Sequence, residues 1–295
     1  MATLDQQPDT AEQGQDRFAR RKRTTQYGKA AVGLLIVLVY LFPVFWMVST
    51  SLKLRGDVFS IPPELFPSPV VFGSYIESVF QSPPVLRALL NSLVIATGTL
   101  FLTLVLGTPA AYALARLRLR FTVLISLVLL LAQMLPTINL ALPLFVIFTD
   151  VGLVDTYAGL ILANTALALP FAIIILRPFF LSVPGELMDA GRVDGCTPFA
   201  VFRRIVLPLI RPGLITVGAL AFVTAWGEFV FGLTLATSEE LQPISVALNR
   251  FIGQYGTRWA DLMAVATIAA LPVIVIFAGL QRFIVGGLTA GATKE

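Results

Sequence analysis

Glu228 is the residue of this 295-residue chain whose type and position best suit a chemical role, because it is a carboxylate inside an apolar run that ends near Ala236. At the rise of a helix it lies about 12 Å from that end. An ionisable group at such a depth in a bilayer is costly unless it faces protein or water. Trp226 is close by, and an aromatic face beside a carboxylate suits a sugar, which stacks its C–H faces and donates hydroxyl hydrogens. Alternatively, Glu228 pairs with another membrane subunit or caps a broken helix.

Three amides in other apolar runs are further candidates for a polar path, namely Gln133, Asn139 and Asn164. Each of them either faces such a path or forms a hydrogen bond between helices. Asp261 lies at the edge of the last apolar run, where we expect it to be solvated.

Other chemistry is excluded by what the chain lacks. It has no histidine, so Ser-His-Asp and Cys-His catalysis, histidine-ligated zinc and histidine proton relays are impossible. Its Gly28-Lys29 pair lacks the upstream glycine of a GxxxxGK[ST] phosphate loop. The sequence therefore predicts a non-catalytic chain with no metal site and no bound cofactor. Any energy that it uses must come from an ion gradient or a partner.

The composition indicates whether this chain is surrounded by water or by lipid. The chain is 57% hydrophobic and 13% charged, with a mean hydropathy of +0.85, whereas soluble domains carry about 25% charged residues. A bilayer core requires roughly 20 apolar residues of helix. The sequence predicts an all-α integral membrane protein with six spans, the third of which contains Pro136 and Pro143 and could be two shorter pieces. The spans are expected at about 30–49, 91–115, 121–148, 157–180, 213–236 and 260–284.

The basic residues predict the orientation. Most of the 21 lysines and arginines fall on one side of these spans, the side that includes both termini, and Lys and Arg are retained on the cytoplasmic side. The net charge of +4 is explained by anionic lipid headgroups, so no nucleic acid partner is expected. Residues 1–28 are predicted to be a disordered cytoplasmic tail. The single cysteine, Cys196, excludes an intrachain disulfide.

A polar island at residues 186–208 interrupts the apolar runs and reads ELMDAGRVDGCTPFAVFRRIVLP. Ser182 is predicted to cap a helix that carries Pro184 and Glu186 in its first turn and ends near Gly195, where a residue without Cβ can take a left-handed turn. Such a helix would lie on the cytoplasmic side.

A second short helix is expected to begin at Thr197, with Thr197 as N-cap and Pro198 at its first position. Pro208 and Pro212 would end it. Its apolar stripe consists of Phe199, Phe202 and Val206. The pair of helices is either an interfacial connector whose phenylalanines dip into lipid or a docking element for a cytosolic partner.

The pattern D-A-G-x-x-x-G-x9-I-x-L-P, from Asp189 to Pro208, resembles the EAA loop of permease subunits of bacterial ABC importers. Asp189 and Gly191 depart from the family pattern, and Gly191 weakens a helix by up to about 1 kcal/mol relative to Ala. The resemblance implies that a loop spanning residues 182–212 couples the permease to an ATPase subunit. Its candidate coupling residues are Glu186, Asp189, Ala190, Gly191, Gly195, Thr197, Phe199, Phe202, Ile205 and Pro208.

Two more motifs resemble the carbohydrate-importer permeases, in the subfamily that includes the second permease of the maltose importer. Residues 225–229 read AWGEF where those permeases have AWNEF, and residues 281–292 read QRFIVGGLTAGA, close to their C-terminal motif. The resemblance covers residues 29–295 and implies the permease domain of a type I ABC importer in the bacterial cytoplasmic membrane. It also implies the partners: a second permease, two ATPase subunits that bind ATP and magnesium, and an extracytoplasmic solute-binding protein.

A secondary transporter driven by an ion gradient is the alternative function. Such transporters commonly contain inverted repeats, and no convincing repeat is visible in this sequence. Two predicted outside loops, at about residues 50–90 and 237–259, would either receive the binding protein or pack against their own subunit. The resemblance implies a carbohydrate or a polyol derivative as substrate.

Overall fold

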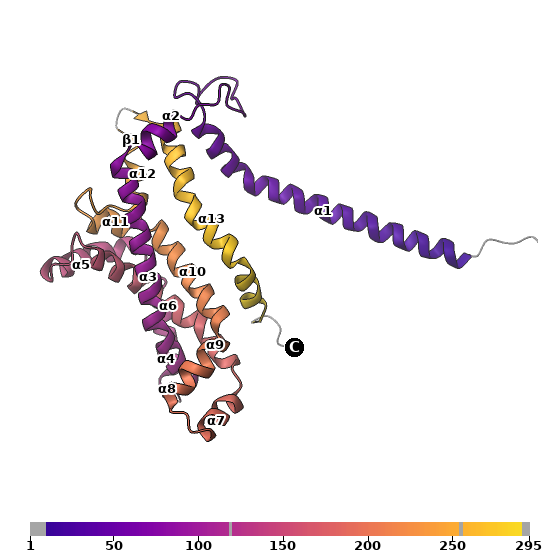
Figure 1. The fold of residues 1–295 in the computed structure, drawn as a ribbon, viewed down its shortest axis with the longest axis vertical. Coiled ribbons are helices and arrows are strands. Elements are labelled where there is room, and N and C mark those ends of the chain that lie inside the picture. The colour runs from indigo at the N-terminus through magenta and orange to yellow at the C-terminus, as the bar shows by residue number, and fades with distance from the viewer. Residues whose placement is uncertain (1–9, 118–119, 254–255, 291–295) are drawn as a thin grey trace, which may run out of the picture.

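The computed structural model describes residues 10–117, 120–253 and 256–290, and helices make up most of it (Figure 1). Long helices form an elongated body in which α3 packs along α6 and α10, and α10 packs against α13. These long helices are α1 (Thr10–Ser51), α3 (Pro83–Arg116), α6 (Tyr157–Ser182), α10 (Arg211–Gly227) and α13 (Trp259–Ala290).

Short elements gather at the two ends of the body (Figure 1). One end, here called the α7 end, carries α7 (Gly185–Val193), α8 (Pro198–Val201), the π-helix η2 (Phe202–Val206) and α9 (Leu207–Leu209). The opposite end, here called the α2 end, carries α2 (Gly73–Tyr75), the π-helix η1 (Ile76–Phe80), α12 (Ile244–Asn249), β1 (Ile252–Gly253) and β2 (Gly256–Thr257). The two strands are antiparallel, with Ile252 opposite Thr257.

Four helices in the described part of the chain are long and apolar enough to cross a membrane: Gly28–Ser51, Pro83–Arg116, Tyr157–Ser182 and Trp259–Gln281. Two bent helix pairs raise this number to as many as six if each pair is one span. The all-α membrane fold predicted from the sequence is therefore confirmed.

The third and the fifth predicted spans are each divided into shorter helices. Helices α4 (Thr122–Ala132) and α5 (Thr137–Asp150) meet at 96°, as the proline at position 136 had suggested. The predicted fifth span is divided into α10 and α11 (Val230–Leu235), with a break at Glu228. A bend of 76° separates α8–α9 from α10. Pro208 does not end a helix, because α9 continues through it to Leu209.

Two helices begin earlier than predicted. Helix α3 starts at Pro83, since proline is favoured in the first turn, and its buried Val85 and Ala88 make this part amphipathic rather than uniformly apolar. Helix α1 starts at Thr10, within the predicted disordered tail. Residues 1–9 of that tail lie outside the described residues, as do Gly291 and Ala292 of the C-terminal motif.

Helix α1 stands apart from the body (Figure 1). Residues 28–45 are all exposed, whereas Ser49, Thr50 and Ser51 at its α2 end are buried. The exposed stretch is apolar, as a surface facing lipid or another membrane protein has to be.

Small residues allow the remaining long helices to approach closely, which is the usual way that membrane helices pack. A Cβ at Gly213 would lie 2.6 Å from Cγ of Phe179, so α10 can contact α6 there only with glycine. A Cβ at Gly98 of α3 would similarly meet the end of Ile161 in α6. Three apolar clusters fill the space between these helices.

Candidate functional site

The α7 end carries the predicted helix-turn-helix. Helix α7 has Glu186 in its first turn and ends at Val193. Gly195 follows with φ of +80°, so the left-handed turn predicted there is confirmed. The amide of Cys196 donates to the carbonyl of Gly191, and that of Gly195 donates to Arg192. These two bonds form a Schellman motif, which satisfies the carbonyls at the end of a helix.

The start of α8 also matches the prediction, whereas the start of α7 does not. The hydroxyl oxygen of Thr197 accepts a hydrogen bond from the amide of Ala200, with Pro198 at the first helical position. Ser182 is not a cap: it is the last residue of α6, and its hydroxyl donates to the carbonyl of Phe179. The helix α6 simply continues further than predicted, and Pro184 takes the N-cap position of α7.

The predicted apolar stripe of the second helix is wrong at Phe199, which is 69% exposed. A π-turn at η2 changes the spacing, so the residues that face inward are Val201, Val206 and Ile210. Phe202 does face inward, where its ring lies 4.9 Å from that of Tyr112. The 3.6-residue periodicity assumed from the sequence does not hold across a π-turn.

Gly191 has a packing role that the sequence did not reveal. A Cβ at this position would lie 2.5 Å from the terminal methyl carbon of Ile205, so the glycine lets α7 lie close to η2. Ile205 can give way only by moving the end of a flexible side chain. The departure from the family pattern therefore has a structural reason in this chain.

Arg116 fastens this loop to the body. It is the last residue of α3, and its guanidinium donates to the carbonyl oxygens of Phe180 and Val183, at 2.6 Å to Phe180. Met188 of α7 is buried in the same apolar cluster as Leu176. An arginine at the C-terminus of a helix was the available signal, since such residues often bind free carbonyls.

The outward surface of the loop is mixed in character. Val193, before the Gly195 turn, is 87% exposed, and Phe199, after it, is also exposed. Asp189 and Arg192 form an exposed ion pair at 2.9 Å. Of the other candidates, Glu186, Ala190, Thr197 and Pro208 are exposed and Ile205 is half-buried. The result is a rigid base that presents apolar and charged groups together.

The candidate path residues do not form one site. The carboxylate of Glu228 accepts hydrogen bonds from the amides of Phe231 and Gly232, so Glu228 caps α11 at the break after α10. Capping of a broken helix is one of the roles that the sequence leaves open for Glu228. Trp226 is buried, stacks on Phe222 and donates its indole N–H to the carbonyl of Ala269 in α13. It therefore links two helices and does not stand beside Glu228 as a sugar platform.

The three amides differ in their surroundings. Asn164 is buried and donates to the carbonyl of Leu160 in its own helix. Asn139 is exposed on α5. Gln133, between α4 and α5, donates to the carbonyl of Leu167 and lines a groove of about 210 Å³ between α6 and α10. Thr224 and Phe171 also line this groove.

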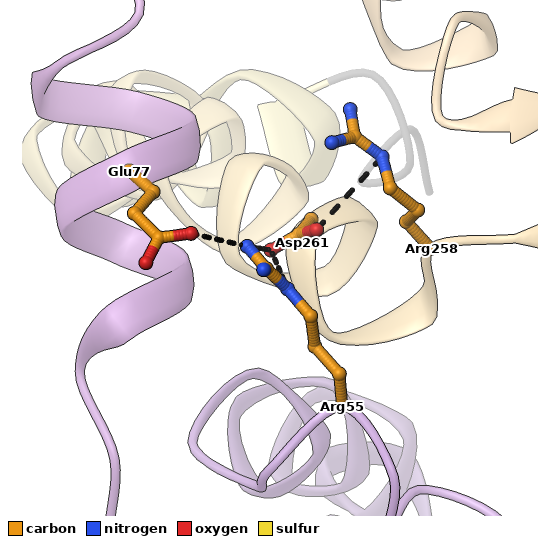
Figure 2. A network of polar contacts seen from close by, with 4 residues as sticks. All are labelled: Arg55, Glu77, Arg258 and Asp261. Atoms are coloured by element: carbon orange, nitrogen blue, oxygen red, sulfur yellow. Dashed lines mark hydrogen bonds and ion pairs between the residues drawn. The ribbon is translucent and has the colours of Figure 1, made fainter.

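Asp261 contradicts the expectation of a solvated carboxylate, because its side chain is 0% exposed. It accepts hydrogen bonds from Arg55, which comes from a segment far away in the sequence (Figure 2). Nothing local to either residue predicts this contact, because the two are 206 positions apart in the sequence.

The chain thus combines apolar helices long enough to span a membrane, some of them broken, with an exposed and firmly attached helix pair at one end that another protein can engage. The chain belongs to the family of binding-protein-dependent transport system inner membrane components, whose model matches residues 103–289. It is therefore a permease subunit of an ABC importer, not an enzyme, and the alternative of a secondary transporter is set aside.

Known proteins similar to this chain agree with that membership. The trehalose transport system permease protein SugB of Mycobacterium tuberculosis is 39% identical, over 90% of this chain and 96% of its own. The diacetylchitobiose uptake system permease protein DasC of Streptomyces coelicolor is 35% identical, over 90% and 95%. A chain of a bacterial ABC transporter that imports alginate has the same fold, with a TM-score of 0.75, 20% identity and coverage of 89% and 97%.

Proposed function

We propose that this chain is a permease of a carbohydrate importer and that the loop at residues 182–212 is its docking surface for a cytosolic ATPase subunit. The observation that carries the proposal is the α7–α9 arrangement. Its tip exposes Val193 and Phe199, while its base is held by Arg116 and a buried apolar cluster. Large apolar side chains on a rigid, exposed loop are typical of a surface that another protein covers.

The attachment of the loop supports a mechanical role. Arg116 joins the end of α3 to the end of α6, and Tyr112 of α3 contacts the ring of Phe202 in the loop. A displacement of α7 would therefore pass to both long helices instead of being absorbed by a flexible connection. ATP and magnesium would be bound by the ATPase subunits, and this chain would transmit their motion.

The relatives support the substrate class. The two permeases described above are named for a disaccharide or a derivative of one, trehalose and diacetylchitobiose. Within this chain, the groove lined by Gln133 and Thr224 is the candidate wall of the sugar path, with Asn139 nearby in sequence on α5. Glu228 would shape that path by breaking the helix rather than by binding sugar.

The assembly that we propose has this chain beside a second, different permease, on two ATPase subunits, with a solute-binding protein on the opposite face. Both termini would lie in the cytoplasm, and the α2 end would face outward. The excess of basic residues in the predicted cytoplasmic segments supports this orientation.

Docking is tested by co-purification. We expect Val193→Asp and Phe199→Asp each to lose the ATPase subunit, because a buried carboxylate at an apolar contact costs several kcal/mol. Ile61→Asp is the matched control, since Ile61 is also a highly exposed apolar residue, in the segment after α1 at the opposite end. Retention of the ATPase by both loop variants would show that it docks elsewhere.

The substrate class is tested separately, by uptake into proteoliposomes that hold the assembled importer and its binding protein. We expect transport of a disaccharide such as trehalose or diacetylchitobiose, driven by ATP. Uptake of an amino acid or an oligopeptide in place of any sugar derivative would overturn the carbohydrate assignment and leave the docking proposal untouched.

A further inference from the structure

Four ionised side chains meet at the α2 end (Figure 2). Arg55 lies between two carboxylates: its Nη2 is 2.6 Å from Oε2 of Glu77 and 3.0 Å from Oδ1 of Asp261, and its Nε is 3.2 Å from that same Oδ1. Arg258 is further away, with its Nε 3.9 Å from Oδ2 of Asp261. These residues come from the segment after α1, from η1 and from the start of α13.

The two carboxylates that Arg55 contacts are not equivalent. The side chain of Glu77 is 58% exposed, whereas that of Asp261 is fully buried. The first turn of a helix favours a negative charge, but burial without a partner is strongly unfavourable. Oδ2 of Asp261 has no hydrogen-bond donor among the described residues. Arg55 therefore supplies the hydrogen bonds that make this buried carboxylate tolerable, and Glu77 only adds an exposed contact.

The contacts around Arg55 all hold the same end of α1. The hydroxyl of Ser51 lies 2.7 Å from that of Tyr75, and the ammonium of Lys53 donates to the carbonyl of Glu64 at 2.6 Å. Phe59, a little further along, contacts Trp259 at the start of α13 edge-on. Thus the last residues of α1 and the segment after it are fixed to α2, η1 and α13.

The rest of α1 has the opposite character, since residues 28–45 are exposed and the helix runs away from the body (Figure 1). Its membrane-spanning part contains 24 residues, a length of about 36 Å. A rotation of roughly 10° at the fixed end would move the far end by roughly 6 Å. Small changes at the α2 end are therefore amplified along α1.

We propose that Arg55 is a positioning residue for α1 and that, through its bonds to buried Asp261, it determines the direction in which α1 leaves the body. Asp261 is the fixed point, because it belongs to the first turn of α13 and cannot move without unpacking that turn. Glu77 is dispensable for this role. This role of Arg55 concerns only the α2 end of the body and does not require that the ATPase docks at the α7 end.

The direction of α1 is measured by pulsed electron spin resonance on the full chain in lipid nanodiscs. Spin labels at Val37 of α1 and Val275 of α13, both exposed, report the distance between the two helices. Cys196, the single cysteine, is first replaced by serine. Wild type is expected to give one narrow distance distribution.

Two variants separate positioning from stability. Arg55→Ala leaves the buried carboxylate of Asp261 without its hydrogen-bond donor and with only the distant Arg258 at 3.9 Å, so it lowers the melting temperature as well as releasing α1. The double variant Arg55→Ala with Asp261→Asn replaces that carboxylate by a neutral amide, so we expect it to regain stability relative to Arg55→Ala. Its distance distribution is nevertheless expected to stay broadened, or shifted by roughly 6 Å or more.

Glu77→Gln is the matched control and is expected to keep the wild-type distribution, since it changes the exposed partner of Arg55 alone. A wild-type distribution in the double variant would overturn the proposal, because the direction of α1 would then follow from stability or from other contacts. A change in Glu77→Gln as large as that in the double variant would also overturn it, by showing that Asp261 is not the fixed point.

Discussion

At the scale of single residues, ionisable side chains in this permease stabilise breaks and connections of the backbone. Glu228 accepts hydrogen bonds from two amides of α11, and its own carbonyl accepts one from the hydroxyl of Ser245 at 2.7 Å. A carboxylate at an N-terminus satisfies amides that a broken helix leaves free. One residue thus makes an interrupted membrane helix possible.

Asp155 has a comparable role in the connection between α5 and α6. It adopts φ of 56°, its amide donates to the carbonyl of Leu235, and its carboxylate accepts hydrogen bonds from the amide and hydroxyl of Ser238. The hydrogen bond from the Ser238 backbone is the main cause that lowers the pKa of Asp155. The carboxylate therefore holds α11 and its following loop against α6 while it is ionised.

The expected consequence is a pH-dependent stability. Because the folded-state pKa of Asp155 is lowered, its contribution is present above the unfolded-state pKa of about 4 and is lost as the pH falls through the lower folded value. Asp155→Asn, which tolerates the left-handed backbone, is expected to cost about 1 kcal/mol at pH 7. This cost should shrink below about pH 4.

Thermal unfolding in detergent at several pH values measures this effect. Asp150→Asn, an exposed carboxylate at the end of α5, controls for the general loss of one negative charge and is expected to change little. An Asp155→Asn cost that stays constant down to pH 3 would contradict the assignment.

At the scale of elements, the α7–α9 loop is held rigidly but depends on one residue with an unusual backbone conformation. Gly195 takes a conformation that few other residues adopt, and it does so where two hydrogen bonds close the end of α7. The direction in which α8 leaves α7 depends on this single turn. The π-turn at η2 then brings Val201 and Val206 to the same buried side.

Gly195→Pro is expected to leave the protein inserted in the membrane but to uncouple transport from ATP hydrolysis, because proline holds φ near −65° and cannot adopt the positive φ of this turn. Gly185→Ala is the matched control: Gly185 is the first residue of α7, the helix that precedes the Gly195 turn, and a Cβ at Gly185 would meet nothing within 4 Å. The measurement is the ratio of sugar transported to ATP hydrolysed in proteoliposomes.

Asp189→Lys belongs to the same experiment. It replaces an exposed ion pair with Arg192 by two like charges, a change worth at most about 1 kcal/mol of stability, so a loss of coupling would reflect the docking surface and not unfolding. Unaltered coupling in both Gly195→Pro and Asp189→Lys would remove the loop from the mechanism.

At the scale of the whole molecule, the two ends of the body have different tasks. The α7 end is formed by consecutive residues and presents a rigid surface. The α2 end is assembled from segments far apart in the chain, for example Asn91, which donates to the carbonyls of Glu240 and Gln242 and accepts from Tyr157. The α7 end offers a surface on which a partner can act, and the α2 end joins the helices that must move together.

Cysteine labelling tests the orientation of these ends. In a Cys196→Ser background, Ile61→Cys at the α2 end is expected to react with an impermeant maleimide in intact spheroplasts. Val193→Cys at the α7 end is expected to react only after the membrane is permeabilised. Both introduced sites are highly exposed in this chain, 95% and 87% respectively, and expression without the ATPase subunit leaves the proposed docking surface uncovered, so the side of the membrane decides the result. The opposite pattern would reverse the predicted topology.

Much of this protein could be predicted from its sequence, because apolar run length, helix caps and glycine turns are local properties. The membrane class follows from apolar runs of roughly 20 residues, and the break near Pro136, the Thr197 cap and the left-handed Gly195 follow from residues within one or two turns of each other. The family motif at Asp189–Pro208 is equally local. Three local predictions were wrong: Ser182 as a cap, Phe199 as a buried residue and Pro208 as the end of a helix. Helix α6 extends through Ser182, a π-turn intervenes after Phe199, and α9 continues through Pro208.

Only the tertiary structure decided which distant groups meet. Sequence alone left Glu228 with three roles, and the fold places its carboxylate on the amides of α11. Trp226 packs against α13, and the buried carboxylate of Asp261 accepts hydrogen bonds from Arg55. Such pairings depend on how helices approach one another in space. No periodicity or spacing along the chain records a contact between residues that are 206 positions apart.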